Sequence, residues 1–326
     1  MARRDSAEML VDEVPAWVGP WCRENLGSEP VEVLFAVAQM SVVLGLCLDD
    51  GAEVVLKARE DDSRAKACVL AQAQLAERGF PCPRPLTAAI SSGGMVLHAE
   101  EFRPGGEVSG GDTPEVASRY GGVFGWLLAE LQNVRVAPPL PNPRWVCWDH
   151  AGRGVWPSIG FLDQRDQSVV PQFVEDIAQR VRARLRGADA PCVLGHSDFE
   201  AQNLRWHGPT LWALHDWDSL AWQPEAALVG AASGAFPRSP GEPPTLASLT
   251  SSEAFLNAYQ NVRGRPFTPD ELELAWAASL WPAAHNARWD ALHGEPESPS
   301  TTALIEQAAD RLARAGVRPV GGIRAR

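Results

Sequence analysis

Apolar and polar residues alternate along the first third of the chain in a way that predicts β-strands. Between residues 31 and 57, alternating leucines are followed by the turn Asp49-Asp50-Gly51 and then by the run "EVVLK", which ends at Lys57. Alternation on both sides of an Asp-Gly turn is typical of an antiparallel hairpin. A further apolar run, "GMVLHAEEF", predicts another strand that ends near Phe102.

The rest of the chain has the spacing and the capping residues of helices. Residues 64–78 are rich in helix-forming side chains and stop at Gly79. Thr113 can cap a helix whose first position is Pro114. Apolar residues four positions apart predict an amphipathic helix directly before residue 193, namely Phe173, Ile177, Val181 and Leu185.

Two capping boxes predict where the C-terminal helices begin. They pair Thr250 with Glu253 and Thr268 with Glu271. In such a box, each side chain accepts a hydrogen bond from the backbone N–H of the other residue, which stabilises the first helical turn. The second box is expected to start one long helix over residues 270–292.

Together these elements predict an α+β protein with a small strand-rich N-terminal lobe, residues 1–102, and a larger helical C-terminal lobe, residues 103–326. The length of 326 residues suits one or two domains. A net charge of −12 argues against nucleic-acid binding. We expect no membrane span, because no apolar run of about 18 residues occurs, and no signal peptide. Six cysteines without a CxxC pair suggest reduced thiols in a cytoplasmic protein.

Four polar residues of the kind that bind metals or protons lie in two neighbouring segments. Asp198 and Asn203 lie in "VLGHSDFEAQNLRW", and Asp216 and Asp218 lie in "LHDWDSL". The apolar hairpin between the segments is expected to bring them to the same end. Aspartate and asparagine are common in turns for structural reasons alone. As an ordered set, however, they suit Mg²⁺, which binds one or two carboxylates and completes its shell with phosphate oxygens and water.

The spacing H-x-D-x-x-x-x-N followed by D-x-D resembles the catalytic and metal loops of the aminoglycoside phosphotransferase family. Members of this family phosphorylate small molecules and are relatives of the protein kinases. The resemblance covers roughly residues 31–293, including "VVLK", "AQLAERGFPCPRPL" and "EEFRPGG". It implies a protein-kinase-like two-lobed fold, with a small antiparallel sheet in the N-terminal lobe. It also implies an enzyme that transfers phosphate from ATP or GTP, with Mg²⁺, to a hydroxyl of a small molecule.

The resemblance implies a role for each residue of the two segments. Asp198 would be the catalytic residue, accepting a hydrogen bond from the hydroxyl of the substrate and orienting it. Asn203 and Asp216 would hold the metal against the phosphates. Asp218 would assist the metal or fix its loop, and His196 would anchor the loop rather than act as an acid or base.

The same resemblance implies a nucleotide site in the N-terminal lobe. Lys57 would bind the α- and β-phosphates, and Val55, on the same face of the strand, would cover the adenine. Backbone groups of Glu100, Glu101 and Phe102 would meet the adenine edge.

The chain departs from the family pattern at three places. The helix over residues 64–78 lacks the glutamate that would pair with Lys57, because Cys68 stands at the expected position and Gln72 one turn later. Lys57 must then be held by another acid, by Gln72 or only by the phosphates. The phosphate-covering segment, "AVAQMSVVLGLCL", has Gly45 as its one glycine, and His215 precedes Asp216 where an apolar residue is usual.

These departures leave a second class of function open, a kinase-like protein that binds a nucleotide or small molecule without transferring phosphate. A metal-dependent hydrolase is a third hypothesis, but it gives no reason for Lys57. Among substrates, an aminoglycoside comes first by family, with choline-like, sugar, macrolide and amino-alcohol acceptors as alternatives. Acids that would suit an amine-rich substrate are Glu225, Asp270, Glu271, Glu273 and Asp290. The sequence leaves the oligomeric state open.

Overall fold

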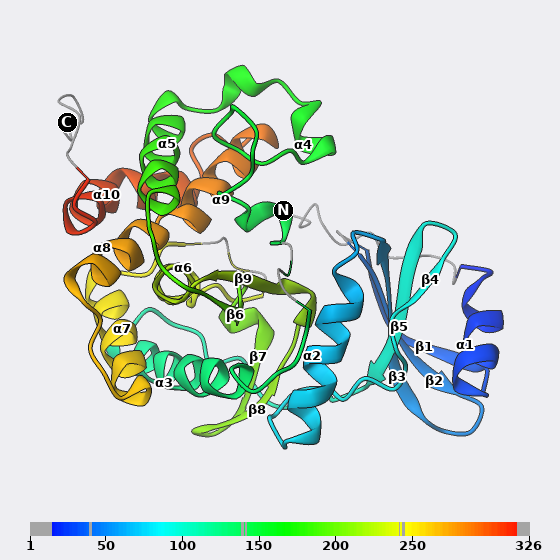
Figure 1. Ribbon diagram of the computed structural model, residues 1–326. Coiled ribbons are helices and arrows are strands. Elements are labelled where there is room, and N and C mark those ends of the chain that lie inside the picture. The colour runs from blue at the N-terminus through cyan, green and yellow to red at the C-terminus, as the bar shows by residue number, and fades with distance from the viewer. Residues whose placement is uncertain are drawn as a thin grey trace. The chain divides into compact units, whose positions relative to one another are not determined.

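In a computed structural model, the chain forms two compact units (Figure 1). The described residues are 15–38, 41–137, 140, 142–240, 242 and 245–317. The first unit comprises the described residues up to Gly106 together with Val134–Ala137 and His207–Asp218, and the second unit comprises the remainder. The predicted lobe boundary between residues 102 and 103 stays a prediction.

The first unit is built on a five-stranded antiparallel sheet with strand order β1-β2-β3-β5-β4. The strands and helices, with the later strand β8, are α1 (Val18–Leu26), β1 (Pro30–Ala38), β2 (Val42–Leu48), β3 (Glu53–Glu60), α2 (Ala65–Glu77), β4 (Ile90–Ser92), β5 (Met95–Glu101) and β8 (Thr210–Leu214). The predicted hairpin turn at Asp49-Asp50-Gly51 joins β2 to β3, with Gly51 at φ +83°. The two segments predicted as strands are therefore confirmed.

The two faces of this sheet differ in chemistry, because successive residues of a strand point to opposite sides. On β3, Val54, Leu56 and Ala58 face an apolar core that includes Val18 and Trp21 of α1. The alternate residues of β3 are Val55, Lys57 and Arg59, all of them buried. Helix α2 packs on this second face, and Figure 1 shows α1 and α2 on opposite sides of the sheet.

The second unit is mainly helical. Its helices are α3 (Pro114–Leu131), α4 (Gly160–Asp163), α5 (Gln172–Arg186), α6 (Glu225–Ala235), α7 (Leu249–Arg263), α8 (Pro269–Ala278), α9 (Trp281–Leu292) and α10 (Pro299–Arg314). Short 3₁₀ turns are η1 (Arg144–Val146), η2 (Gln167–Val169), η3 (Ala201–Asn203) and, where the chain passes from the first unit to the second, η4 (Trp217–Ser219). The strands are β6 (Cys192–His196), β7 (Leu204–His207) and β9 (Leu220–Pro224), and β6 pairs antiparallel with β9.

Glycines allow two pairs of helices in this unit to approach closely. A Cβ atom at Gly121 of α3 would overlap the carbonyl oxygen of Phe255 in α7. A Cβ atom at Gly230 of α6 would likewise overlap the carbonyl oxygen of Ala275 in α8. These positions therefore require glycine for packing rather than for an unusual backbone angle.

The predicted helix starts are partly right. Thr113 caps α3, and Thr268 and Glu271 form the capping box of α8. The box at Thr250 and Glu253 is wrong, because α7 is capped two residues earlier by Ser248, whose hydroxyl accepts from the Ser251 N–H.

The single long helix expected over residues 270–292 is also wrong, since α8 ends at Ala278 and α9 begins at Trp281. The physical reason is Pro282, which lies in the first turn of α9 and has no N–H to donate to the preceding turn.

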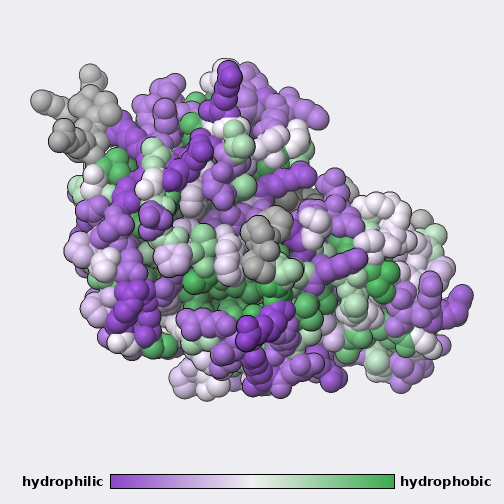
Figure 2. All heavy atoms as spheres, viewed as in Figure 1, coloured by the Kyte–Doolittle hydropathy of each residue, from purple (hydrophilic) through white to green (hydrophobic). Residues whose placement is uncertain are grey.

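The surface visible in Figure 2 is mostly hydrophilic, with apolar side chains in smaller patches between the polar ones. Among the described residues, no helix is long and apolar enough to cross a membrane. The N-terminal residues 1–14, where a signal peptide was not expected, and residues 39–40 of the phosphate-covering segment lie outside the described residues.

Candidate active site

The loop after β6 holds the first pair of predicted site residues, Asp198 and Asn203. The side-chain amide of Asn203 donates to the carboxylate Oδ2 of Asp198 at 2.9 Å and to its backbone oxygen at 2.8 Å. Both hydrogen bonds use Nδ2 of Asn203, so neither of them occupies the carbonyl oxygen Oδ1. The two residues are thus joined within the fold of the loop itself.

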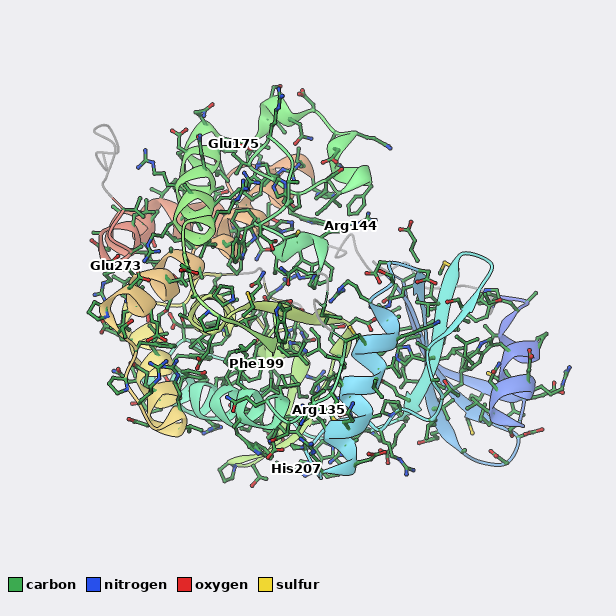
Figure 3. The ribbon with its side chains drawn as sticks, viewed as in Figure 1. Arg135, Arg144, Glu175, Phe199, His207 and Glu273 are labelled. Carbon is green, nitrogen blue, oxygen red and sulfur yellow. The ribbon has the colours of Figure 1, made fainter. Side chains whose placement is uncertain are left out.

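Several contacts fix this predicted catalytic loop within the second unit. The Nδ1 atom of His196, a fully buried residue, accepts from the Asp198 N–H at 3.3 Å within the same loop, and its expected role as an anchor of the metal loop stays a prediction. Ser197 donates from both its N–H and its hydroxyl to the Ser219 carbonyl. Phe199 is buried with its ring centroid 4.7 Å from that of Phe124 (Figure 3). The half-buried Asp198 side chain therefore belongs to a loop that is hydrogen bonded and packed on both sides of it.

The predicted metal loop follows β8 in the first unit. Asp216 has a left-handed backbone with φ +59°, a conformation that few residues other than glycine adopt and that is concentrated at turns and functional sites. Next to it, Trp217 is buried and donates from Nε1 to the Leu214 carbonyl at 2.9 Å. The indole thereby holds the loop in place and sets the position of the aspartate on either side of it.

Asp218 pairs with a cation that the sequence reasoning missed. Its Oδ1 lies 3.0 Å from Nη1 of Arg59 on β3, and its backbone oxygen accepts from Arg64 at 3.1 Å. Burial alone would raise the pKa of Asp218, but the charges of Arg59 and Lys57 outweigh it and lower the pKa. A signal was present in the sequence, because Arg59 stands two residues after Lys57 and so shares its strand face.

Lys57 is held by another acid, which resolves the question left by the missing helix glutamate. Its Nζ lies 2.9 Å from Oε1 of Glu100 on β5, and both side chains are buried. The other carboxylate oxygen of Glu100 accepts from Nε2 of Gln72 at 2.9 Å. Although burial opposes the charged form, the negative charges of Glu100, Asp218 and Asp216 raise the pKa of Lys57 to about 12.

Residues predicted to meet the adenine lie at the end of β5 and beside it. Val55 pairs with Glu100 across the sheet and is buried. The Glu101 N–H donates to the Arg84 carbonyl at 2.8 Å, and the Phe102 N–H donates to Glu53 at 3.4 Å. The Phe102 bond is the longer and therefore the more easily exchanged for a ligand.

Gly45 serves a packing purpose that the sequence did not indicate. It pairs with Phe35 of β1, and a Cβ atom at position 45 would overlap the Phe35 ring. That ring lies 5.8 Å from the ring of Phe102. Gly45 thus makes room for an aromatic side chain that packs against the end of β5.

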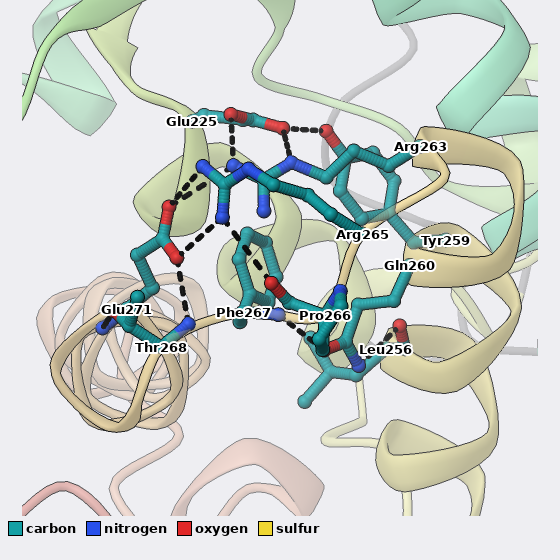
Figure 4. Close-up of polar contacts among 10 residues, drawn as sticks. All are labelled: Glu225, Leu256, Tyr259, Gln260, Arg263, Arg265, Pro266, Phe267, Thr268 and Glu271. Atoms are coloured by element: carbon teal, nitrogen blue, oxygen red, sulfur yellow. Dashed lines mark hydrogen bonds and ion pairs between the residues drawn. The ribbon is translucent and has the colours of Figure 1, made fainter.

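Most acids considered for binding an amine-rich substrate are already paired with arginines (Figure 4). Arg263 binds Glu225 through Nε at 2.6 Å and Glu271 through Nη2 at 3.0 Å. Arg265 also binds Glu271. On the neighbouring surface, where Figure 3 labels Glu273 on α8, Arg184 binds Asp270 and Glu273. Asp290 is partly buried, and this burial raises its pKa.

The donor groups fit a magnesium ion and a nucleotide phosphate. The two hydrogen bonds of the Asn203 amide use Nδ2 and not Oδ1. An amide oxygen and an aspartate carboxylate are hard oxygen ligands of the kind that magnesium binds. Lys57 has three donors, of which Glu100 occupies one. Within the described ranges, no group of three or more His, Cys, Asp or Glu residues is arranged to hold a metal. A site with fewer protein ligands leaves the other positions to water and phosphate oxygens.

The predicted residues therefore form two groups. Asp198 and Asn203 contact each other in the second unit. In the first unit, Lys57 contacts Glu100 directly and is influenced by the charges of Asp216 and Asp218. Their assignment as catalytic, nucleotide-binding and metal-binding residues stays a prediction.

Comparison with known proteins gives an independent view of the chain. The sequence profile of the Phosphotransferase enzyme family, APH, matches residues 48–227, more than half of the chain. No curated protein matches the sequence significantly.

Among solved structures, the chain is similar to the amicoumacin kinase hAmiN in complex with AMP-PNP, Ca²⁺ and Ami. The TM-score is 0.57 and the identity 14%, over 88% of this chain and 89% of that one. It is also similar to a thermostable mutant of aminoglycoside phosphotransferase APH(4)-Ia with ADP and hygromycin B, with a TM-score of 0.53 and 13% identity, over 93% and 100% of the two chains. These likenesses confirm the predicted protein-kinase-like fold.

Proposed function

Because the chain belongs to the phosphotransferase enzyme family and is a small-molecule kinase by that membership, we propose that it transfers the γ-phosphate of ATP, with Mg²⁺, to a hydroxyl of a small molecule. The observation that carries the proposal is the Asp198–Asn203 pair, which orients a half-buried carboxylate and leaves an amide oxygen for a metal. We also propose a cytoplasmic location, on the basis of the cysteine pattern. GTP is the alternative phosphate donor.

In this proposal Asp198 acts on the acceptor. Its carboxylate accepts a hydrogen bond from the attacking hydroxyl and orients the oxygen for in-line attack on phosphorus. The Asn203 amide and the His196 ring hold the loop so that Asp198 loses little entropy in reaching that geometry. His196 itself is completely buried and makes no proton transfer in this scheme.

The proposal assigns residues to the nucleotide and to the metal as the resemblance implies. When bound, magnesium neutralises charge on the phosphates as phosphoryl transfer proceeds. Asn203 and Asp216 would hold it, and Lys57 would bind phosphate oxygens. We assign Asp218 to fixing the loop, because its carboxylate is already paired with Arg59. Val55 and the backbone of Glu100, Glu101 and Phe102 would bind the adenine.

The acceptor is proposed more broadly than an aminoglycoside. The family makes an aminoglycoside the first compound class to test, and the relative with hygromycin B supports that order. However, four of the five candidate acids are bound to arginines, which reduces the negative charge available for a polyamine. Less cationic alcohols, such as macrolides, sugars or amino alcohols, should therefore be tested together with aminoglycosides.

A non-catalytic nucleotide-binding protein is the second candidate. It is favoured by the absence of a glutamate from α2 at the expected position, where Cys68 stands. The buried Lys57–Glu100 pair argues against it, because it restores a charged and oriented lysine from another strand.

The test is phosphate transfer from Mg-ATP to a panel of aminoglycosides, macrolides, choline and sugars, with products identified by mass spectrometry. Asp198→Asn should lower the rate by about 100- to 10,000-fold, the range that a positioned acid–base group contributes, and leave ATP affinity nearly unchanged. Asp310→Asn, an exposed change on α10, is the matched control. Full activity in Asp198→Asn would show that the role given to Asp198 is wrong.

A further inference from the structure

Lys57 stands in a buried polar cluster whose members come from three elements. Glu100 reaches it from β5 and Gln72 from α2, and His98 lies opposite Lys57 in the β3–β5 pairing. Each of these four side chains belongs to a residue at least nine-tenths buried. A charge placed this deeply is costly unless it is paired and hydrogen bonded, so the arrangement around Glu100 determines whether Lys57 can remain charged.

Strand register places Glu100 within reach of Lys57. In the antiparallel β3–β5 pair, Lys57 is opposite His98 and Val55 is opposite Glu100. Glu100 is therefore the diagonal neighbour of Lys57 on the same face, a distance that long side chains can bridge. The ion pair at 2.9 Å joins two adjacent, hydrogen-bonded strands.

Gln72 fixes the orientation of Glu100. Its Nε2 carries two hydrogens and donates one to Glu100 at 2.9 Å and one to the Pro83 carbonyl at 2.8 Å. Rotating the amide by half a turn would set its oxygen against the Glu100 carboxylate and lose both bonds. The amide orientation is thus determined by its surroundings, and it leaves Oε1 of Glu100 directed at Lys57.

We propose that Glu100 is the positioning residue for the phosphate-binding Lys57, with Gln72 holding Glu100 in place. This inference rests on the proposed function. The acid lies on strand β5, which is hydrogen-bonded to the strand that carries Lys57, and α2 contributes the amide of Gln72 in place of an acid. Glu100 also connects the two ends of the nucleotide site, because its side chain holds the phosphate-binding lysine and its backbone lies where the adenine is expected.

The experiment is calorimetric titration with Mg-AMP-PNP and, separately, with adenosine. Lys57 acts on phosphates, so Glu100→Gln should weaken AMP-PNP binding by about 10- to 100-fold, the worth of one hydrogen bond to a charged group. Adenosine affinity should change less than about twofold, since adenosine lacks the phosphates. Glu60→Gln, an exposed change at the end of the same strand as Lys57, is the control and should leave both affinities unchanged.

Two further variants make the result decisive. In Lys57→Gln the added change Glu100→Gln should have no additional effect on AMP-PNP affinity, because Glu100 acts through Lys57 and the two effects are not additive. The doubly neutral variant contains neither a buried lysine nor a buried carboxylate without its partner, so it reports even where Glu100→Gln fails to fold.

The possible outcomes distinguish failure of the positioning role from failure of the proposed function. Equal loss of adenosine and AMP-PNP binding, or an additive effect in the Lys57→Gln background, would overturn the positioning role. AMP-PNP affinity that is unchanged in folded Glu100→Gln would overturn it as well. Failure of the unaltered protein to bind AMP-PNP would contradict the proposed function itself.

Discussion

Two networks of charged side chains use the same chemistry for different ends. In the first unit, Lys57 and Glu100 form a buried pair whose carboxylate is held by Gln72. In the second unit, Arg263 connects Glu225 at the start of α6 with Glu271 at the start of α8 (Figure 4). The first network presents a cation, and the second joins three helices.

The difference follows from the two cations. Lysine is a point charge with three donors, so one carboxylate can orient it and leave donors for a phosphate. Arginine is a planar fork that binds carboxylates at several nitrogens, and Arg263 also stacks 4.6 Å over the Phe267 ring. Under the proposed function the lysine network would serve a ligand, whereas the arginine network joins helices of the second unit through acids that were candidates for binding a cationic substrate.

The largest effect on stability is expected from removing Arg263, the central arginine of the second network. Arg263→Met leaves Glu225 and Glu271 without their shared partner, and only a tenth of the Arg263 side chain is exposed. We expect the free energy of unfolding to fall by about 3 kcal/mol, the cost of removing one partner from a largely buried ion pair. Urea unfolding measures this change, and nucleotide affinity of the folded variant should be unaltered.

Arg265→Met provides the contrast for that variant. The Arg265 side chain is 54% exposed although it binds the same Glu271 carboxylate. Its loss should cost less than about 1 kcal/mol, as for other surface ion pairs. Equal destabilisation by the two changes would contradict the central position given to Arg263.

The arginine network should also make stability depend on acid pH. The Arg265 hydrogen bond is the main cause that lowers the pKa of Glu271 from 4.5 to about 2, against partial burial and with help from the Thr268 N–H and Arg263. A carboxyl whose folded pKa is depressed contributes stability above the unfolded value and loses it as pH falls through the folded value. The free energy of unfolding should therefore decline between about pH 4.5 and about pH 2. The decline should be shallower in Glu271→Gln, and the same slope in both proteins would contradict the assignment.

A small effect is also expected at the N-terminal cap of α8, the helix that contains Glu271. The Thr268 hydroxyl accepts from the Glu271 N–H, and the Thr268 N–H donates to the Glu271 carboxylate at 2.7 Å. Thr268→Ala removes the first bond and keeps the second, so we expect a loss of about 1 kcal/mol in unfolding free energy. Thr250→Ala is the control, because Thr250 lies inside α7 and Ser248 is the cap there. A larger loss at Thr250 would contradict the observed helix start.

Local sequence patterns were sufficient for much of the fold. The strand ending at Lys57 and the helix capped by Thr113 depend on neighbouring residues, and both are as expected. The loop contact between Asp198 and Asn203 is also local, since five positions separate them. The error at residues 270–292 was avoidable, because Pro282 marks a helix break in the sequence itself.

The partner of Lys57 could not be assigned because it depends on strand order. Glu100 lies 43 positions away in the chain, and only the β3–β5 pairing brings it to the same face. Its signal in the sequence was an acid inside an apolar strand, which requires a partner without naming it. The pairing of Glu225 with Arg263 is equally remote, since it requires α6 and α7 to pack.

The most direct test of the central claim is calorimetric titration of the protein with AMP-PNP in the presence and absence of Mg²⁺, repeated with Asp216→Ala. The account predicts binding that is strengthened by Mg²⁺ and a loss of that strengthening in Asp216→Ala. Binding that is indifferent to Mg²⁺ in both proteins, or no binding under any condition, would contradict the proposed kinase site and favour a non-catalytic protein.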